Sequence, residues 1–343
     1  MSRSLDLEVD RTTATREDEM NPALTLLLLL TALVSLHVGS TDIAVLDGLW
    51  QWLNGTDSAA AIVIGEIRLP RTLLALTVGA ALGMSGAALQ GLLRNPLADP
   101  GLTGASQGAA LGAASVFYFG LFPAAGAAAP ALAGLIGAGI AMSLMLLLAG
   151  PSRQAMVIMA GLAISTLTGS LLAAVLNFAP NPFALSELVF WLLGSVSERG
   201  LDHLWILGPA LLIGGGLIWS QRRLLLGLSL GEQVAQSMGL SYTRGSRLII
   251  LGAALLVGAS VAVAGAIGFV GLLVPHLVRP LVKNRPDRIL IPAALVGAIL
   301  VCVADIVVRW MPPGRELKLG VLTSLIGAPL FIWLVWQERK RWL

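Results

Sequence analysis

Long uncharged apolar stretches, separated by short charged segments, follow one another along the chain from residue 20 onward. They cover residues 20–41, 72–93, 100–152, 154–186, 204–221, 248–278, 289–304 and 319–337. Because a helix needs about 20 apolar residues to cross a bilayer, most of these stretches predict one spanning helix each. Shorter apolar runs at 60–64 and 188–194 predict interfacial segments. The pattern indicates an all-α polytopic integral membrane protein.

Two stretches do not fit a single helix. The stretch 100–152 is long enough for two helices, which predicts a break near Pro123 or Pro130. The stretch 248–278 is too long for one helix and short for two, and it contains several glycines, so a broken or half-length pair is expected. Counted in this way, the chain has about ten transmembrane helices.

Composition agrees with this class. The chain is 56% hydrophobic and 12% charged, whereas soluble domains carry about 25% charged residues. A chain of 343 residues with this content leaves no room for a soluble catalytic domain. The acidic segment 1–19 lacks the basic start of a secretory signal, so we expect an uncleaved, disordered tail. We expect a single transmembrane domain over residues 20–338, which includes a cytoplasmic segment at 227–240, and a basic C-terminus at 339–343.

Charge asymmetry predicts the orientation. With cytoplasmic N- and C-termini, most of the 22 basic residues fall on the cytoplasmic side, as the positive-inside rule requires. The basic residues that fall outside are Arg68, Arg71, Arg199, Arg309, Arg315 and Lys318. Asp305 and Arg309 stand four residues apart and can pair on one helical face. Their charges near membrane depth indicate either a functional role or a snorkelling interfacial pair.

Three further patterns suggest packing or docking. Gly104, Gly108 and Gly112 repeat every four residues, which predicts that they lie on one helical face and allow close approach of a neighbouring helix. The segment 95–100 holds two prolines and predicts a rigid turn. In the largest inner loop, Gly231 and Gly239 bracket a short helix-forming stretch that begins at Glu232 and is expected to carry Val234, Ala235 and Met238 on one face. This stretch suits either docking on a soluble partner or a plain surface connector.

Several kinds of chemistry are absent from the sequence. It has no G-x-x-x-x-G-K-[ST] phosphate loop, so the chain is not itself a P-loop ATPase. It has neither H-E-x-x-H nor G-x-S-x-G, and its histidines are too scattered to build a metal site. We therefore expect no catalytic residue, no metal, no cofactor and no nucleic-acid partner.

These residues together resemble the FecCD family, the permease subunits of bacterial ABC importers for iron–siderophores, haem and vitamin B12. The matching blocks are Arg68–Arg71, Gly86–Gln90, Asn95–Pro100, Gly104–Gly108, Phe190–Ser195, Glu232–Gly239, Gly268–Arg279, Ala304–Arg309 and Glu316–Pro329. Lys318 stands where the family usually has proline, Thr103 where an apolar residue is common, and Asn284–Asp287 lacks the family's histidine.

The resemblance implies a type II ABC importer permease in the bacterial inner membrane. It implies a homodimer with a path at its two-fold axis, two cytoplasmic ATPase subunits and a periplasmic substrate-binding protein. It assigns Gly231, Glu232, Ala235, Met238 and Gly239 to the segment that couples to the ATPase. It also suggests that Arg68, Arg71 and Arg309 meet carboxylates on the binding protein.

Two other classes of protein remain as alternatives. A stand-alone secondary carrier or channel would transport without ATPase subunits, but the spans lack the buried carboxylates expected of ion coupling. An intramembrane enzyme would need paired catalytic residues, which the sequence does not offer. The cargo is not decided by the sequence: an iron chelate is the first expectation, followed by haem and cobalamin.

Overall fold

The computed structural model describes residues 2–39, 41–119, 129–150, 154–178, 182–311 and 317–342. The side chains of residues 2–19, 154–155, 182–184 and 338–342, and of residues 102, 117, 187 and 335, lie outside the description, as do the expected break at Pro123 and Arg315. Of the predicted tail 1–19, only the backbone of residues 2–19 is described. The helices are α1 (Ser2–His37), α2 (Val45–Leu53), α3 (Ala59–Ile62), η1 (Val63–Arg68), α4 (Leu69–Leu92), η2 (Pro100–Thr103), α5 (Ala105–Phe119), α6 (Ala129–Ala149), α7 (Gln154–Asn177), α8 (Pro182–Leu192), η4 (Leu201–His203), α9 (Leu204–Ser220), α10 (Arg222–Leu230), α11 (Glu232–Ser237), α12 (Tyr242–Ala264), α13 (Val270–Val278), α14 (Leu290–Arg309) and α15 (Leu319–Trp342).

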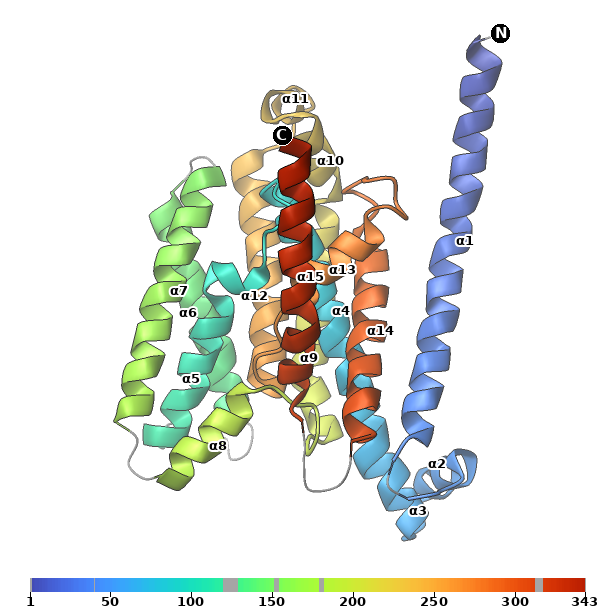
Figure 1. Ribbon diagram of the computed structural model, residues 1–343, viewed down its shortest axis with the longest axis vertical. Helices are drawn as coiled ribbons and strands as arrows, with labels where there is room; N and C mark the ends of the chain where they lie inside the picture. Colours follow the sequence, from blue (N-terminus) through green and yellow to red (C-terminus); the bar gives the residue numbers. More distant parts are fainter. Residues whose placement is uncertain are drawn as a thin grey trace.

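The described part of the chain is helical and holds seven helices that are long and apolar enough to cross a membrane. The helices α5, α13 and α15 run beside them in the bundle (Figure 1). This confirms the predicted all-α polytopic fold. Two ends can be distinguished: α10 and α11 project at one, and α2 and α3 lie at the other. We call these the α11 end and the α2 end.

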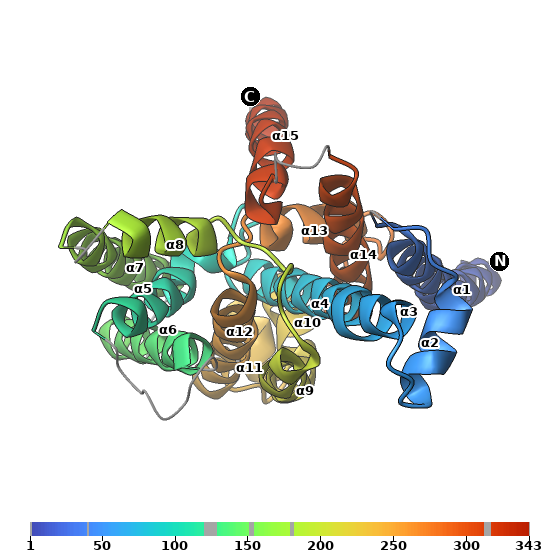
Figure 2. The same cartoon turned by 90° about the horizontal axis from the view of Figure 1, so that it is seen from below.

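The core of the bundle is formed by α4 and α12, each with 78% of its apolar window buried. Viewed along the bundle, α4 and α12 lie in the middle, while α1, α7 and α15 stand at the periphery (Figure 2). Only 11% of the α1 window is buried, and most of its leucines are exposed. Apolar side chains on such an outer helix are suited to contact with lipid.

Glycines bring α4 close to its neighbours. A methyl group at Gly79 would overlap the carbonyl oxygen of Gly297 on α14, and one at Gly86 would overlap that of Gly271 on α13. Helices in membranes associate through such small residues because lipid supplies no hydrophobic driving force between them. α4 is therefore packed backbone against backbone on α13 and α14.

The predicted break within 248–278 is confirmed. α12 ends at Ala264, and Gly265 follows with φ +71°, a value that favours glycine. An irregular segment then leads to the short helix α13, which begins after Phe269 at φ +65°. The two helices are therefore joined by a non-helical segment whose ends, Gly265 and Phe269, have positive φ.

The apolar run 60–64, which was expected to be an interfacial segment, is continuous with the following helix. α3, the π-helical turn η1 and α4 form one continuous helix over Ala59–Leu92. The charges that ended the predicted span have partners in the protein, because the exposed Glu66 accepts from the indole of Trp52 and Arg71 pairs with the buried Asp305. A charged residue breaks a hydropathy pattern without breaking a helix.

Candidate functional site

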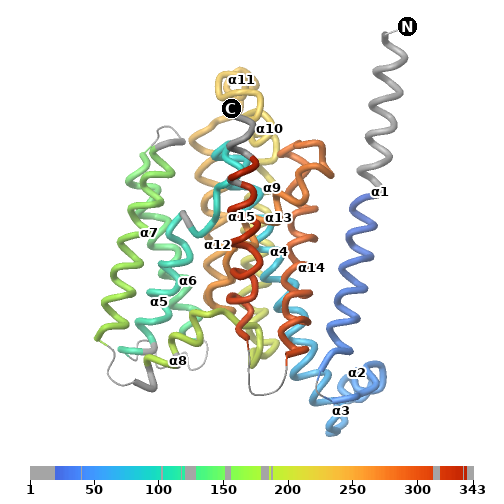
Figure 3. The backbone as a smooth tube through the Cα atoms, viewed as in Figure 1, coloured from blue at the N-terminus to red at the C-terminus, as the bar shows by residue number. Residues whose placement is uncertain are grey.

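The α11 end carries the short segment that sequence analysis assigned to docking. Gly231 at φ +120° separates α10 from α11, and Gly239 at φ +75° follows α11, so two glycines turn the chain sharply on either side of it. Figure 3 shows α11 as a small loop of chain at the tip of the bundle. This position leaves one side of α11 open to a partner.

The expectation that Val234, Ala235 and Met238 share one face was wrong, because these side chains differ in burial. Ala235 is 1% exposed and packs against Gly227 of α10, whereas Val234 is 41% and Met238 is 53% exposed. Ala235 therefore fixes α11 on α10, and Val234 and Met238 are available for contact. Glu232 is the first residue of α11, where the positive end of the helix dipole stabilises a carboxylate.

Basic residues gather at the same end. Those at the α11 end are Arg94, Arg222, Arg223, Arg244, Arg247, Arg279, Lys283, Arg285 and Arg288, and those at the α2 end are Arg68, Arg71, Arg199, Arg309 and Lys318. The segregation matches the charge bias of cytoplasmic loops.

At the α2 end, the structure brings Arg71 and Arg309 together around one carboxylate. Arg71 donates from Nε to both oxygens of Asp305 at 3.0 Å, and its Nη2 lies 2.9 Å from Oδ1. Arg309 places Nε 3.1 Å from Oδ2 of the same carboxylate, which confirms the pair expected from the four-residue spacing. Asp305 is 1% exposed, so its charge depends on these two guanidinium groups.

The arginines also hold the C-terminal end of α1. Arg309 donates to the carbonyl oxygens of Ser35 and Val38, at 2.7 and 3.0 Å. Arg68 donates to those of Leu36 and His37, at 3.0 and 3.1 Å. The last carbonyls of a helix have no partner within the helix and favour a nearby positive charge. The cluster thus joins α1, η1, α4 and α14.

These contacts change what can be expected of the three predicted docking residues. Arg68 is 4% exposed, and the side chain of Arg309 is 8% exposed, whereas that of Arg71 is 19% exposed. The sequence located all three at one end of the molecule but gave no sign of their acceptors, since those are mostly backbone carbonyls. The geometry favours Arg71 as the residue that a partner could reach.

The three glycines of the four-residue repeat do not play one role. Gly108 and Gly112 lie in α5, and a methyl group at Gly112 would overlap the carbonyl oxygen of Ala133 on α6. Gly104 precedes α5 at φ +80°, where it ends η2, and it lies beside Ile164 of α7. The expectation of one shared helical face fails for Gly104, because Asp99 and Pro100 start a separate turn there.

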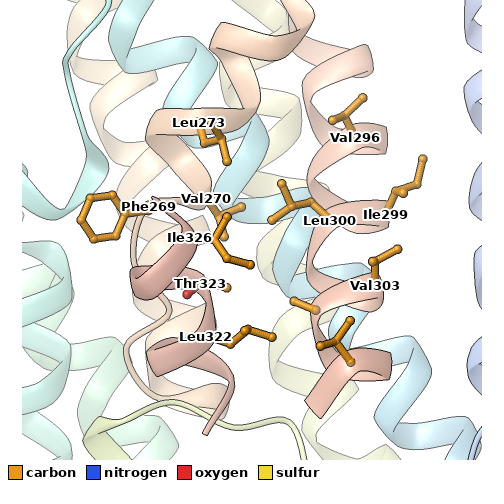
Figure 4. A pocket seen from close by; sticks show the side chains of 12 residues that line it. Phe269, Val270, Leu273, Val296, Ile299, Leu300, Val303, Leu322, Thr323 and Ile326 are labelled. Atoms are coloured by element: carbon orange, nitrogen blue, oxygen red, sulfur yellow. The ribbon is translucent and has the colours of Figure 1, made fainter. Parts of the chain in front are cut away.

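Two cavities border the irregular segment between α12 and α13. One of about 400 Å³ lies between α13, α14 and α15 and is lined by apolar side chains such as Leu273, Leu300 and Ile326, with Thr323 the single polar residue (Figure 4). The other, of about 620 Å³, is lined by small and apolar residues of α8, the 265–269 segment and α15, among them Gly268, Gly320 and Ser324. Neither lining includes a charged residue.

Within the described ranges, no group of three or more His, Cys, Asp or Glu side chains could hold a metal ion.

Sequence reasoning missed a polar contact in the core. Gln90, 2% exposed, donates to the carbonyl oxygen of Leu272 at 3.2 Å and accepts from Arg279. The only sign of this contact in the sequence was a glutamine inside an uncharged span.

The fold, with seven helices long and apolar enough to cross a membrane and a short helix projecting at one end, is that of a multi-pass membrane protein. The chain belongs to the FecCD transport family, which matches residues 27–337. It is 37% identical to the hemin transport system permease protein HmuU of Yersinia pestis over 328 residues, or 94% of this chain and 98% of that one. It is likewise 37% identical to the vitamin B12 import system permease protein BtuC of Salmonella typhi over 327 residues, or 93% of this chain and 95% of that one.

The fold is similar to a solved structure of an inward-facing metal-chelate type ABC transporter. The TM-score is 0.83 at 32% sequence identity, over 93% of this chain and 99% of that one. PsaBC from Streptococcus pneumoniae shares the fold more distantly, with a TM-score of 0.55 at 19% identity, over 84% of this chain and 93% of that one.

Proposed function

We propose that this protein is the membrane-spanning subunit of an ATP-driven importer for an iron chelate, which is a siderophore complex or haem, or for cobalamin. The observation that carries the proposal is α11, a short helix held outside the bundle with Val234 and Met238 exposed. The similarity of this chain to HmuU and BtuC, over almost its whole length, supports the class of cargo. The ATPase subunits, a binding protein and a second permease copy complete the proposed assembly.

The mechanism starts at α11. ATP binding and hydrolysis in the partner subunits move α11, which is in contact with both α10 and α12. Because α12 is one of the two central helices, a shift of its first turn reorients the core of the bundle. The assembly then alternates between states open to either side of the membrane.

The proposed path lies on the side of α8 and α15, at the two-fold axis of the homodimer. The 620 Å³ cavity on this side is lined by small and apolar residues without a charge. Such a surface offers a large cargo room and weak contacts, so that cargo selection falls mainly to the binding protein. The α11 end and both termini are proposed to face the cytoplasm of a bacterial cell whose inner membrane holds the protein.

A proteoliposome assay tests this function. Liposomes containing this chain, with or without its ATPase subunits, receive binding protein loaded with an iron–siderophore complex, haem or cobalamin. We expect uptake of one cargo class only when ATP and the ATPase subunits are present. Uptake driven by a proton or sodium gradient alone would instead establish a secondary carrier. The buried Asp305 argues against the carrier, because two arginines already neutralise it.

We further propose that the binding protein docks at the α2 end through carboxylates, with Arg71 as the most accessible of the three arginines. Exposed ion pairs contribute only about 0–1 kcal/mol but accelerate encounter at low salt. We expect Arg71→Gln to lower the salt dependence of stimulated ATP turnover and to slow association by about tenfold at low salt. Arg223→Gln removes an equal charge at the α11 end and should change neither. An unaltered salt dependence in Arg71→Gln would exclude this docking contact.

A further inference from the structure

A row of large apolar side chains on α2 is exposed at the surface of the protein. Leu46, Trp50 and Leu53 are 81%, 70% and 68% exposed. Their spacing of four and three residues places all three on one face of the helix. Apolar side chains gathered on one exposed face mark a surface that contacts a partner or a membrane.

The face by which α2 packs on the protein is a different one. Val45 is buried, and a methyl group at Gly48 would overlap the side chain of Ile64 in η1. The indole of Trp52 lies so close to Gly65 that a methyl group there would overlap it. These contacts fill the space between α2 and η1, so the exposed row is not needed to hold α2 in place.

A polar row borders the exposed apolar row. Asp47 and Gln51 follow Leu46 and Trp50 by one residue each, which places them about 100° further round the helix. Asp47 is exposed, and Gln51 accepts a hydrogen bond from the hydroxyl of Ser58. A helix with separate apolar and polar faces is typical of a segment that lies in the interface between lipid and water.

The position of α2 agrees with such an interface. α2 lies at the edge of the bundle beside the end of α1, across the direction of the spanning helices (Figure 1 and Figure 2). Other exposed tryptophans stand at the same end, since Trp205 opens α9 and Trp310 follows α14. Tryptophan is enriched where the hydrocarbon of a membrane meets water. The exposed row of α2 therefore adjoins the lipid-facing side of α1 at this boundary.

The charge around α2 distinguishes between kinds of lipid. Residues 41–67 include the carboxylates Asp42, Asp47, Asp57 and Glu66 and contain no arginine or lysine. Interfacial helices bind membranes through buried apolar area and through attraction of basic residues to anionic lipids. Only the first of these contributions is present here, so headgroups without net charge suit this surface best.

We propose that α2 is an interfacial anchor, whose row Leu46, Trp50 and Leu53 inserts between the headgroups and acyl chains of zwitterionic phospholipids. The anchor fixes the link between α1 and η1 at the membrane surface. The inference requires only that the chain lies in a bilayer, and it does not depend on the import function proposed above.

The test is the accessibility of a spin label on α2, measured by electron paramagnetic resonance of the full chain in phosphatidylcholine vesicles. The label is attached to Leu46→Cys, Trp50→Cys or Leu53→Cys, one at a time. Asp57→Cys, at an exposed polar position between α2 and α3, is the matched control. Wild-type protein is the blank, because the single natural cysteine, Cys302, is buried.

We expect a water-soluble nickel chelate to reach the three labels about tenfold less often than the label at position 57, since each replaced side chain faces lipid. Oxygen, which concentrates in hydrocarbon, should reach them more often than it reaches that control. Replacing part of the phosphatidylcholine with phosphatidylglycerol should not deepen the insertion. Thermal unfolding verifies that each labelled variant is folded.

Four results would overturn the proposal. Nickel access equal to that of the control would place the row in water, and insertion that appears only with phosphatidylglycerol would show binding by charge. Spin–spin broadening between labels would assign the row to a second copy of this chain. Loss of access to both reagents only after addition of the binding protein would assign it to that partner.

Discussion

Replacing Val234 or Met238 with aspartate abolishes ATP-driven uptake while the permease stays folded: this is the result we expect with the largest functional effect. Both side chains are largely exposed, so an added charge costs the folded chain little. In the proposed interface the same charge is buried against an apolar groove without a partner, which costs about 3 kcal/mol or more. That corresponds to a loss of roughly a hundredfold in affinity for the ATPase subunits.

The measurement is recovery of the ATPase subunits with the purified permease, together with uptake in proteoliposomes. Ser237→Asp is the matched control, since it adds the same charge to an exposed polar position of α11. Wild-type ATPase recovery with Val234→Asp and Met238→Asp would show that α11 is a surface connector. Ala235→Asp is a poor test, because Ala235 is buried on Gly227 and its replacement would disturb the fold itself.

Asp305→Ala should destabilise the protein more than any other single substitution of a charged residue discussed above. It leaves Arg71 and Arg309 without their shared carboxylate in a site where Asp305 is 1% exposed. Removing one partner of a buried ion pair costs about 3–5 kcal/mol. Thermal unfolding in detergent, followed by loss of monodisperse protein, measures this effect.

Asp287→Ala is the corresponding control. Its partner Arg285 has a side chain that is 41% exposed, so solvent replaces most of the lost interaction and the expected cost is about 0–1 kcal/mol. Similar unfolding temperatures for the two variants would contradict the view that the Asp305 cluster fixes α1 to α4 and α14.

The spans were predictable because apolar length is a direct requirement of the bilayer. The interruption between α12 and α13 was also predictable, because glycine supplies a conformation there that other residues avoid. The pairing of Asp305 with Arg309 followed from helical spacing alone. Each of these features depends on residues that are close together in the sequence.

The features that escaped prediction depend on residues far apart in the sequence. Arg68 is directed inward by carbonyl oxygens of α1, and these have no side-chain signature. The same lack of a local signal hid the continuation of α4 through η1 and the contact of Gln90 with α13. Gly79 was likewise missed, because only a neighbouring backbone shows that its site has no room for a methyl group.

The close glycine contacts of α4 have a consequence for how the molecule can move. Side chains that interdigitate can change rotamer and let two helices slide, but backbones in direct contact have no such freedom. α4, α13 and α14 should therefore travel as one rigid body, with no change in their mutual distances during the transport cycle. Any alternation has to take place at the borders of this body, at the irregular segment 265–269 and along α15, where the large cavities lie.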